Sequence, residues 1–230
     1  MPPEDAAHAP SPQPSALARA WLAVEFAALF FGIPLAFVAA LHADRRYGRA
    51  LIPFLVVGGA LCLLYLFLNK RFDRRQLWNW PACRAYLRPM LLRFAVCAAA
   101  LTGALLALAP DAFLQLPRRN PALWAAIMVL YPVFSAYPQE VMFRAFFFQR
   151  YAPIFAAPLL MVGASALAFG FGHIILNTVA VLLTVAGGAL FAHTYARTRS
   201  LLAASIEHAL YGNFLFTIGF GRFLYLGAGG

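Results

Sequence analysis

Charged residues are scarce in this chain of 230 residues. Asp, Glu, Lys and Arg together make up 11% of it, whereas a soluble domain typically carries about 25%. Hydrophobic residues make up 63%, and the mean hydropathy is +0.74. The composition excludes an ordinary soluble domain and favours an integral membrane protein, most of which is surrounded by lipid.

Cysteine is also rare, and its spacing excludes two kinds of site. The three cysteines, Cys62, Cys83 and Cys97, form no CxxC pair and no even-numbered disulfide framework. Cys62 and Cys97 lie inside apolar runs, where a thiol behaves as a small hydrophobic group. We therefore assign the cysteines no chemistry.

Acidic residues number only eight, against 18 Lys and Arg, which gives a net charge of +10. The basic residues gather between apolar segments, as in loops that face an anionic cytoplasmic leaflet, so we expect a lipid bilayer and not nucleic acid as the partner. With the basic loop around Asp73 on the cytoplasmic side, the N-terminus is cytoplasmic too, and we expect a bacterial inner membrane. That loop contains Lys70, Arg71, Arg74, Arg75, Arg84 and Arg88.

Apolar runs long enough to cross a bilayer, which takes about 20 residues, follow one another closely. They predict an all-α fold, a polytopic transmembrane bundle of about seven to eight helices around a polar intramembrane cavity. Residues 1–16 are rich in Pro and Ala and predict a disordered tail, which leaves 17–230 as a single transmembrane domain. The predicted spans are 17–41, 50–68, 89–109, 121–137 with a continuation to 150, 153–171, 174–196 and 200–222.

A carboxylate and a guanidinium stand out in the fourth span. Glu140 and Arg144 are four residues apart and share a helix face, and with Arg150 they are the only formally charged residues between Arg119 and Arg197. Ionisable groups at membrane depth are costly and mark functional sites. We expect Arg144 to keep Glu140 ionised, as a general base requires; the alternative is a pair that only neutralises itself.

Two histidines follow on later spans. His173 lies in AFGFGHIILNT, one turn before Asn177, and His208 lies in IEHALYGNF. Glu207 and His208 are about 100° apart on a helix and cannot both face one cavity. Tyr211 shares the face of His208, whereas Asn213 does so only if a π-bulge forms near Gly212. Glu25 and His193 are expected to have structural roles.

Familiar hydrolase motifs are missing: there is no HExxH helix, no GxSxG elbow and no clear Ser/Lys dyad. One glutamate and two histidines remain, on three separate segments with amides nearby. Such a set can activate water and stabilise an oxyanion in a water-poor cavity. These are the requirements of peptide-bond hydrolysis.

Three motifs also carry a resemblance. QEVMFR (139–144), FGFGH (169–173) and His208 resemble, in order, the EExxxR, FxxxH and HxxxN signature of the CPBP family (CAAX protease and bacteriocin-processing, also called Abi) of intramembrane proteases. That family includes the Ras-converting CAAX endopeptidase. The resemblance covers roughly residues 121–225. Two positions depart from it, since Gln139 replaces a glutamate and Gly212 replaces the asparagine.

The resemblance implies an intramembrane endopeptidase in which Glu140 and His173 activate water while His208 and an Asn or Tyr donor stabilise the oxyanion. Its substrate would be a membrane protein or a lipidated or leader peptide. The implied catalytic residues are Glu140, His173, His208, Arg144 and Asn213, and the implied substrate-binding residues are Gln139, Asn177 and Tyr211.

Two alternatives stay open beside this reading. We expect no metal, although Glu140, His173 and His208 would also make an acceptable zinc set. The alternative to a protease is a non-catalytic immunity or scaffold protein of the same architecture, or a transporter that uses the buried polar groups.

The depths of the motifs predict an irregular helix. Glu140 lies ten residues from the turn between the fourth and fifth spans and His173 twenty, so straight helices would separate them by about 15 Å in depth. We therefore expect a break at Pro138 or around Gly170–Gly172, or a partly re-entrant segment, which is tolerated where it lines a cavity.

Overall fold

The computed structural model describes residues 15–224, and this part of the chain contains helices and no strands. The all-α polytopic fold is confirmed. Most of the predicted tail, 1–16, lies outside the described residues, and the first helix already begins at Ala16, where Ser15 caps it by accepting from the Ala18 amide. Six stretches are long and apolar enough to cross a membrane: Ala16–Ala43, Arg45–Leu68, Arg74–Leu108, Pro121–Arg150, Thr178–Thr198 and Leu201–Ile218.

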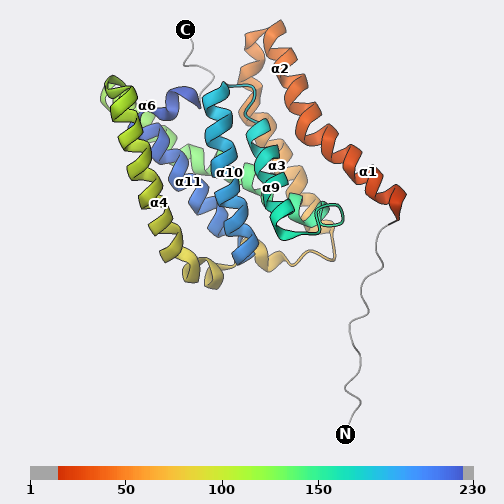
Figure 1. The fold of residues 1–230 in the computed structure, drawn as a ribbon. Helices are drawn as coiled ribbons and strands as arrows, with labels where there is room; N and C mark the ends of the chain where they lie inside the picture. The colour runs from red at the N-terminus through yellow and green to blue at the C-terminus, as the bar shows by residue number, and fades with distance from the viewer. Residues whose placement is uncertain (1–14, 225–230) are drawn as a thin grey trace.

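Figure 1 shows how these stretches divide into helices. The first half holds α1 (Ala16–Ala27), α2 (Ile33–Ala43), α3 (Leu51–Leu68), α4 (Trp80–Leu108) and α5 (Gln115–Arg119). The second half holds α6 (Pro121–Tyr131), α7 (Tyr137–Glu140), α8 (Phe147–Arg150), α9 (Pro158–Phe171), α10 (Thr178–Thr198) and α11 (Leu201–Ile218).

The fourth stretch runs through two wide turns. π-helical segments at Pro132–Ala136 and Val141–Phe146 separate α6, α7 and α8. Proline lacks the N–H that a regular helix needs, and π-helical turns are frequent at functional sites. The predicted break at Pro138 does not occur, because the helical path continues through it in α7.

The predicted break near Gly172 does occur. α9 has only 14 residues and ends at Phe171, which leaves it shorter than the six spanning stretches. A turn follows, and Asn177 then starts α10 by accepting a hydrogen bond from the Ala180 amide at 2.9 Å. His173 therefore lies in a turn at the end of a short helix and not in the middle of a long one.

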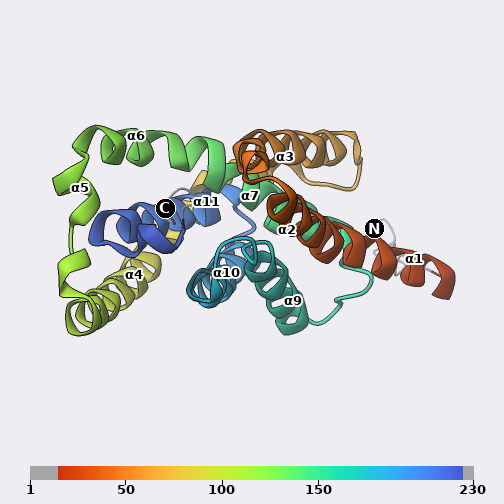
Figure 2. The ribbon, with the colours of Figure 1, turned by 90° about the horizontal axis from the view of Figure 1, so that it is seen from above.

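The helix α11 lies at the centre of the bundle. Seen from above, α4, α6 and α10 surround it (Figure 2), and α11 packs against all three. It is also the most deeply buried of the six spanning stretches. A helix enclosed in this way presents His208 to the interior and not to lipid.

The first helix is attached to the bundle by an ion pair and a cluster of aromatic rings. Glu25 accepts hydrogen bonds from Nε and Nη2 of Arg150 at 2.8 and 2.5 Å and from the Tyr151 hydroxyl at 3.1 Å. The ring of Phe26 packs edge-on against those of Phe147 and Tyr151. Glu25 thus has a structural partner in Arg150.

Close contact between α9 and α10 depends on Gly170. A Cβ atom added there would overlap Val185 of α10, whereas one added at Gly163 of the same helix would meet nothing within 4 Å. Gly170→Ala is expected to lower the thermal unfolding temperature in detergent, because overpacking costs about 1–3 kcal/mol. Gly163→Ala is the matched control and should raise it slightly, since Ala is favoured over Gly in a helix. Equal effects of the two substitutions would contradict this packing.

Candidate active site

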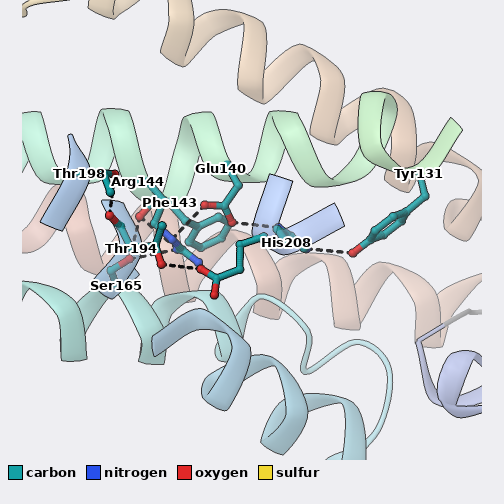
Figure 3. Close-up of polar contacts among 9 residues, drawn as sticks. Tyr131, Glu140, Phe143, Arg144, Ser165, Thr194, Thr198 and His208 are labelled. Carbon is teal, nitrogen blue, oxygen red and sulfur yellow. Dashed lines mark hydrogen bonds and ion pairs between the residues drawn. The ribbon is translucent and has the colours of Figure 1, made fainter. Parts of the chain in front are cut away.

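Two side chains of the stretch Pro121–Arg150 and one side chain of α11 form a hydrogen-bonded row (Figure 3). Nδ1 of His208, on α11, lies 2.9 Å from Oε1 of Glu140, and its Nε2 lies 2.9 Å from the hydroxyl of Tyr131 at the end of α6. An ionised carboxylate only accepts, so Nδ1 carries the hydrogen. In the neutral ring Nε2 is then an acceptor, and Tyr131 donates its O–H to it.

Arg144 holds the other oxygen of Glu140. Its Nε lies 3.2 Å from Oε2, an ion pair between two side chains that are both 0% exposed. Nη1 donates to the Ser165 hydroxyl at 3.1 Å, and the guanidinium lies over the ring of Phe169 at 4.9 Å. The predicted Glu140–Arg144 pair therefore forms as an ion pair, in which Oε2 and Nε make no hydrogen bond to any described residue.

His173 is held by a backbone carbonyl. Its Nδ1 lies 2.8 Å from the oxygen of Phe169, and because a carbonyl only accepts, Nδ1 carries the hydrogen and Nε2 is an acceptor. The ring of Phe169 packs against both imidazoles, with centroids 4.8 Å from His173 and 5.3 Å from His208. The fold thus brings both histidines to one aromatic ring.

A cavity of about 1140 Å³ opens beside these residues. Most of its wall is aliphatic or aromatic, and none of the described residues that line it is Asp, Glu, Lys or Arg. Glu140 and Arg144 lie behind the wall, out of contact with the cavity. The polar side chains that line it are Tyr131, Ser135, Gln139, His173, Thr184, His208 and Tyr211.

Gln139 has a buried acceptor atom without a partner among the described residues. Its Nε2 donates to the Ser135 hydroxyl at 2.8 Å, while Oε1 is buried with no hydrogen-bonding partner within residues 15–224. A buried polar atom without a partner costs about 1–3 kcal/mol. A hydrogen-bond donor bound in the cavity would remove this cost.

Glu207 belongs to a separate buried network. It binds Nη2 of Arg93 and the hydroxyl of Thr194, each at 2.5 Å. These contacts join α4, α10 and α11 and direct the carboxylate away from the partners of His208, as the angle between neighbouring helix positions predicts. We assign Glu207 a structural role.

Two of the predicted amides do not reach the cluster. Asn177 caps α10, and its Nδ2 donates to the Phe223 carbonyl at 2.8 Å on the exposed side of the helix. Helix α11 is regular through Gly212, without the π-bulge, and Nδ2 of Asn213 donates to the Met128 carbonyl at 3.1 Å. Neither is among the residues that line the cavity, whereas Tyr211 is.

Tyr131 contacts His208 but was not predicted as a site residue. No motif includes it, and it lies 77 residues before the histidine that it contacts. The only signal was Gly212, one turn after His208. A Cβ atom at Gly212 would overlap the ring and hydroxyl of Tyr131, so the missing side chain leaves room for the phenol.

The zinc alternative does not fit this arrangement. Among residues 15–224, no three His, Cys, Asp or Glu side chains lie close enough to share a metal ion. Glu140 is already engaged through both oxygens, one of them by a guanidinium. A cation beside Arg144 would also face its positive charge.

The buried ion pair makes a prediction about stability. Arg144→Met leaves a carboxylate buried without its counter-charge and is expected to destabilise the protein by about 3–5 kcal/mol. Adding Glu140→Gln removes that charge and should recover part of the loss, measured as the unfolding midpoint in detergent. Arg46→Met is the control, because its pair with Asp44 is exposed and contributes little. A double variant no more stable than Arg144→Met would contradict the pairing.

The part of the chain that forms this site also matches the model of a known protein family. The model of the family described as type II CAAX prenyl endopeptidase Rce1-like matches residues 121–214, from α6 through most of α11. No curated protein and no solved structure matches the chain. The matched segment contains Glu140, His173, His208 and the Tyr131 that contacts it. Residues 121–214 are therefore similar to the type II CAAX prenyl endopeptidases, and the resemblance that the motifs predict is confirmed over this segment.

Proposed function

We propose that the protein is an intramembrane endopeptidase that hydrolyses a peptide bond of a membrane-associated protein. The observation that carries the proposal is the pair of imidazoles at the wall of one cavity, each with its Nδ1 hydrogen-bonded and its Nε2 an acceptor. The match to a protease family over the same residues supports it. We further propose a bacterial inner membrane with a cytoplasmic N-terminus.

Water activation is assigned to His173 and Gln139. Both line the cavity, and Nε2 of the histidine and Oε1 of the glutamine are acceptors without a partner among the described residues. A water molecule that donates to both keeps a lone pair for attack on a carbonyl carbon. As the O–C bond forms, the water proton passes to Nε2 of His173. When the C–N bond breaks, the same proton passes to the departing amine.

Glu140 takes a different part from the one the motif suggests. The motif predicts that Glu140 removes a proton from water, but its carboxylate is bound by His208 and Arg144 and does not line the cavity. We propose that it orients the imidazole of His208 and selects its tautomer, as carboxylates do for histidines in other hydrolases. Arg144 in turn supplies the counter-charge of the buried carboxylate.

The cavity favours a substrate with a long apolar part. Its volume of about 1140 Å³ exceeds the range of about 300–1,000 Å³ typical of small-molecule pockets. The wall is apolar, so we propose that it receives the lipid group of a lipidated peptide or the apolar residues of a leader, with the peptide bond at the histidines. The family description, which names prenyl endopeptidases, favours the lipid group.

Two observations favour a non-catalytic protein instead. No carboxylate among the described residues lines the cavity, and Gln139 stands where the family has a glutamate. An immunity or scaffold protein, or a transporter, would use the same cavity for binding without hydrolysis. The experiment below separates this candidate from the protease.

His173→Ala is expected to abolish proteolysis without unfolding the protein, because it removes the base and leaves the Glu140–His208 row intact. The measurement is mass spectrometry of protein termini in membranes of cells that express the wild type, His173→Ala or no copy. His193→Ala is the control, since His193 is exposed on α10. Termini that are trimmed with the wild type should be untrimmed with His173→Ala and trimmed with His193→Ala. Identical termini in all samples would favour the non-catalytic candidate.

A further inference from the structure

Peptide hydrolysis also needs a hydrogen-bond donor for the oxygen that becomes negative, and the two histidines do not supply one in their neutral form. Each donates through Nδ1 to a neighbouring oxygen, Glu140 in one case and Phe169 in the other. Their Nε2 atoms are therefore acceptors, which would repel a developing oxyanion. The inference rests on the proposed function: if the protein hydrolyses a peptide bond, the hydrogen-bond donor for the oxyanion must be another side chain.

We propose that Tyr131 is this donor and hence a further catalytic residue. It lines the cavity, and its hydroxyl lies 2.9 Å from Nε2 of His208. The ring packs edge-on against Phe216 at 5.4 Å and against the imidazole of His208 at 5.9 Å. These contacts hold the phenol beside His208, and its O–H, which is donated to Nε2 of that histidine, can turn to a ligand in the cavity.

Gly212 is what allows the phenol to lie there. It follows His208 by one turn and so lies on the same face of α11. A Cβ atom at this position would overlap Cε1, Cζ and the hydroxyl of Tyr131. The space next to His208 that a side chain on α11 would fill is filled by a side chain from α6.

Other donors near the histidines are engaged or buried. Nε2 of Gln139 donates to Ser135, and Nδ2 of Asn213 donates to Met128. The ring of Tyr211 packs against Phe94 and Phe191, with centroids at 5.1 and 5.9 Å, and its hydroxyl is buried without a hydrogen-bonding partner among the described residues. Tyr131 is the hydroxyl that contacts an imidazole of the site.

In the proposed hydrolysis, Tyr131 has the same protonation state before and after the reaction. As water attacks, the electron pair of the C=O double bond moves to oxygen, and the Tyr131 O–H turns from Nε2 of His208 to this oxygen. When the intermediate collapses, the double bond forms again, the C–N bond breaks, and the amine takes the proton that His173 received from water. Tyr131 keeps its own proton and returns to His208, whose orientation by Glu140 positions the phenol.

Tyr131→Phe tests the donor role on a substrate found by the terminus experiment. The ring is retained and the donor is lost, so kcat should fall about 10²–10³-fold, as when one oxyanion donor is removed, with KM nearly unchanged. Tyr137→Phe is the control and should leave both constants unchanged, since its ring stacks on Trp78 away from the cavity. Full kcat in Tyr131→Phe, with cleavage still lost in His173→Ala, would overturn the Tyr131 proposal alone.

Two variants of the glycine separate a donor role from a packing role. Gly212→Ala displaces the phenol and should lower kcat as Tyr131→Phe does. Tyr131→Ala combined with Gly212→Asn removes the ring and places an amide donor in the same space, and it should recover at least tenfold over Tyr131→Ala. No recovery in a double variant that folds as the wild type does would contradict the donor role.

A chemical readout tests the contact without turnover. Nε2 of His208 accepts the Tyr131 hydrogen bond, so Tyr131→Phe should make diethyl pyrocarbonate modify His208 several-fold faster, measured by peptide mass spectrometry against exposed His193. An unchanged rate would overturn the contact and the proposal. Absence of any cleavage by the wild type would instead overturn the proposed function and, with it, the role of Tyr131.

Discussion

The burial of one carboxylate among apolar helices determines the geometry of the interior. Glu140 is completely buried, where an isolated charge would be very costly. Arg144 binds one oxygen and His208 the other, and Arg144 extends the contact to Ser165 of α9. The carboxylate therefore ties α7, α9 and α11 to one point. The orientation of His208, and through it that of Tyr131, follows from this point.

Irregular backbone places the participants around the carboxylate. One π-helical segment separates Tyr131 from α7, and the other follows Glu140 and contains Arg144. The early end of α9 puts His173 in a turn. Membrane interiors tolerate such backbone where it lines a cavity. Gly212 adds the space for the phenol. Local departures from ideal helix geometry thus assemble the site, while the regular helices α4, α10 and α11 enclose it.

Much of the fold was predictable because hydropathy and chain length act locally. Five predicted spans coincide closely with spanning stretches, whereas the span 89–109 begins well after the start of the stretch Arg74–Leu108 and the span 153–171 corresponds to the shorter helix α9. The pairing of Glu140 with Arg144 followed from their spacing on one turn. Asn177 and Asn213, which were expected near the histidines, lie elsewhere. Both amides found nearer partners, a helix N-terminus in one case and the Met128 carbonyl in the other, and such competition between hydrogen-bonding partners is not visible in a motif.

By itself, the sequence determined that the chain is a helical membrane protein and which ionisable residues its interior must accommodate, because each apolar run requires a helix and each buried charge a partner. Only the tertiary structure decided which partners they are. The contact between Tyr131 and His208 joins residues 77 positions apart, and the choice of Arg150 for Glu25 spans 125. Contacts of this range depend on how the helices pack against one another, and a single sequence carries no local pattern for them.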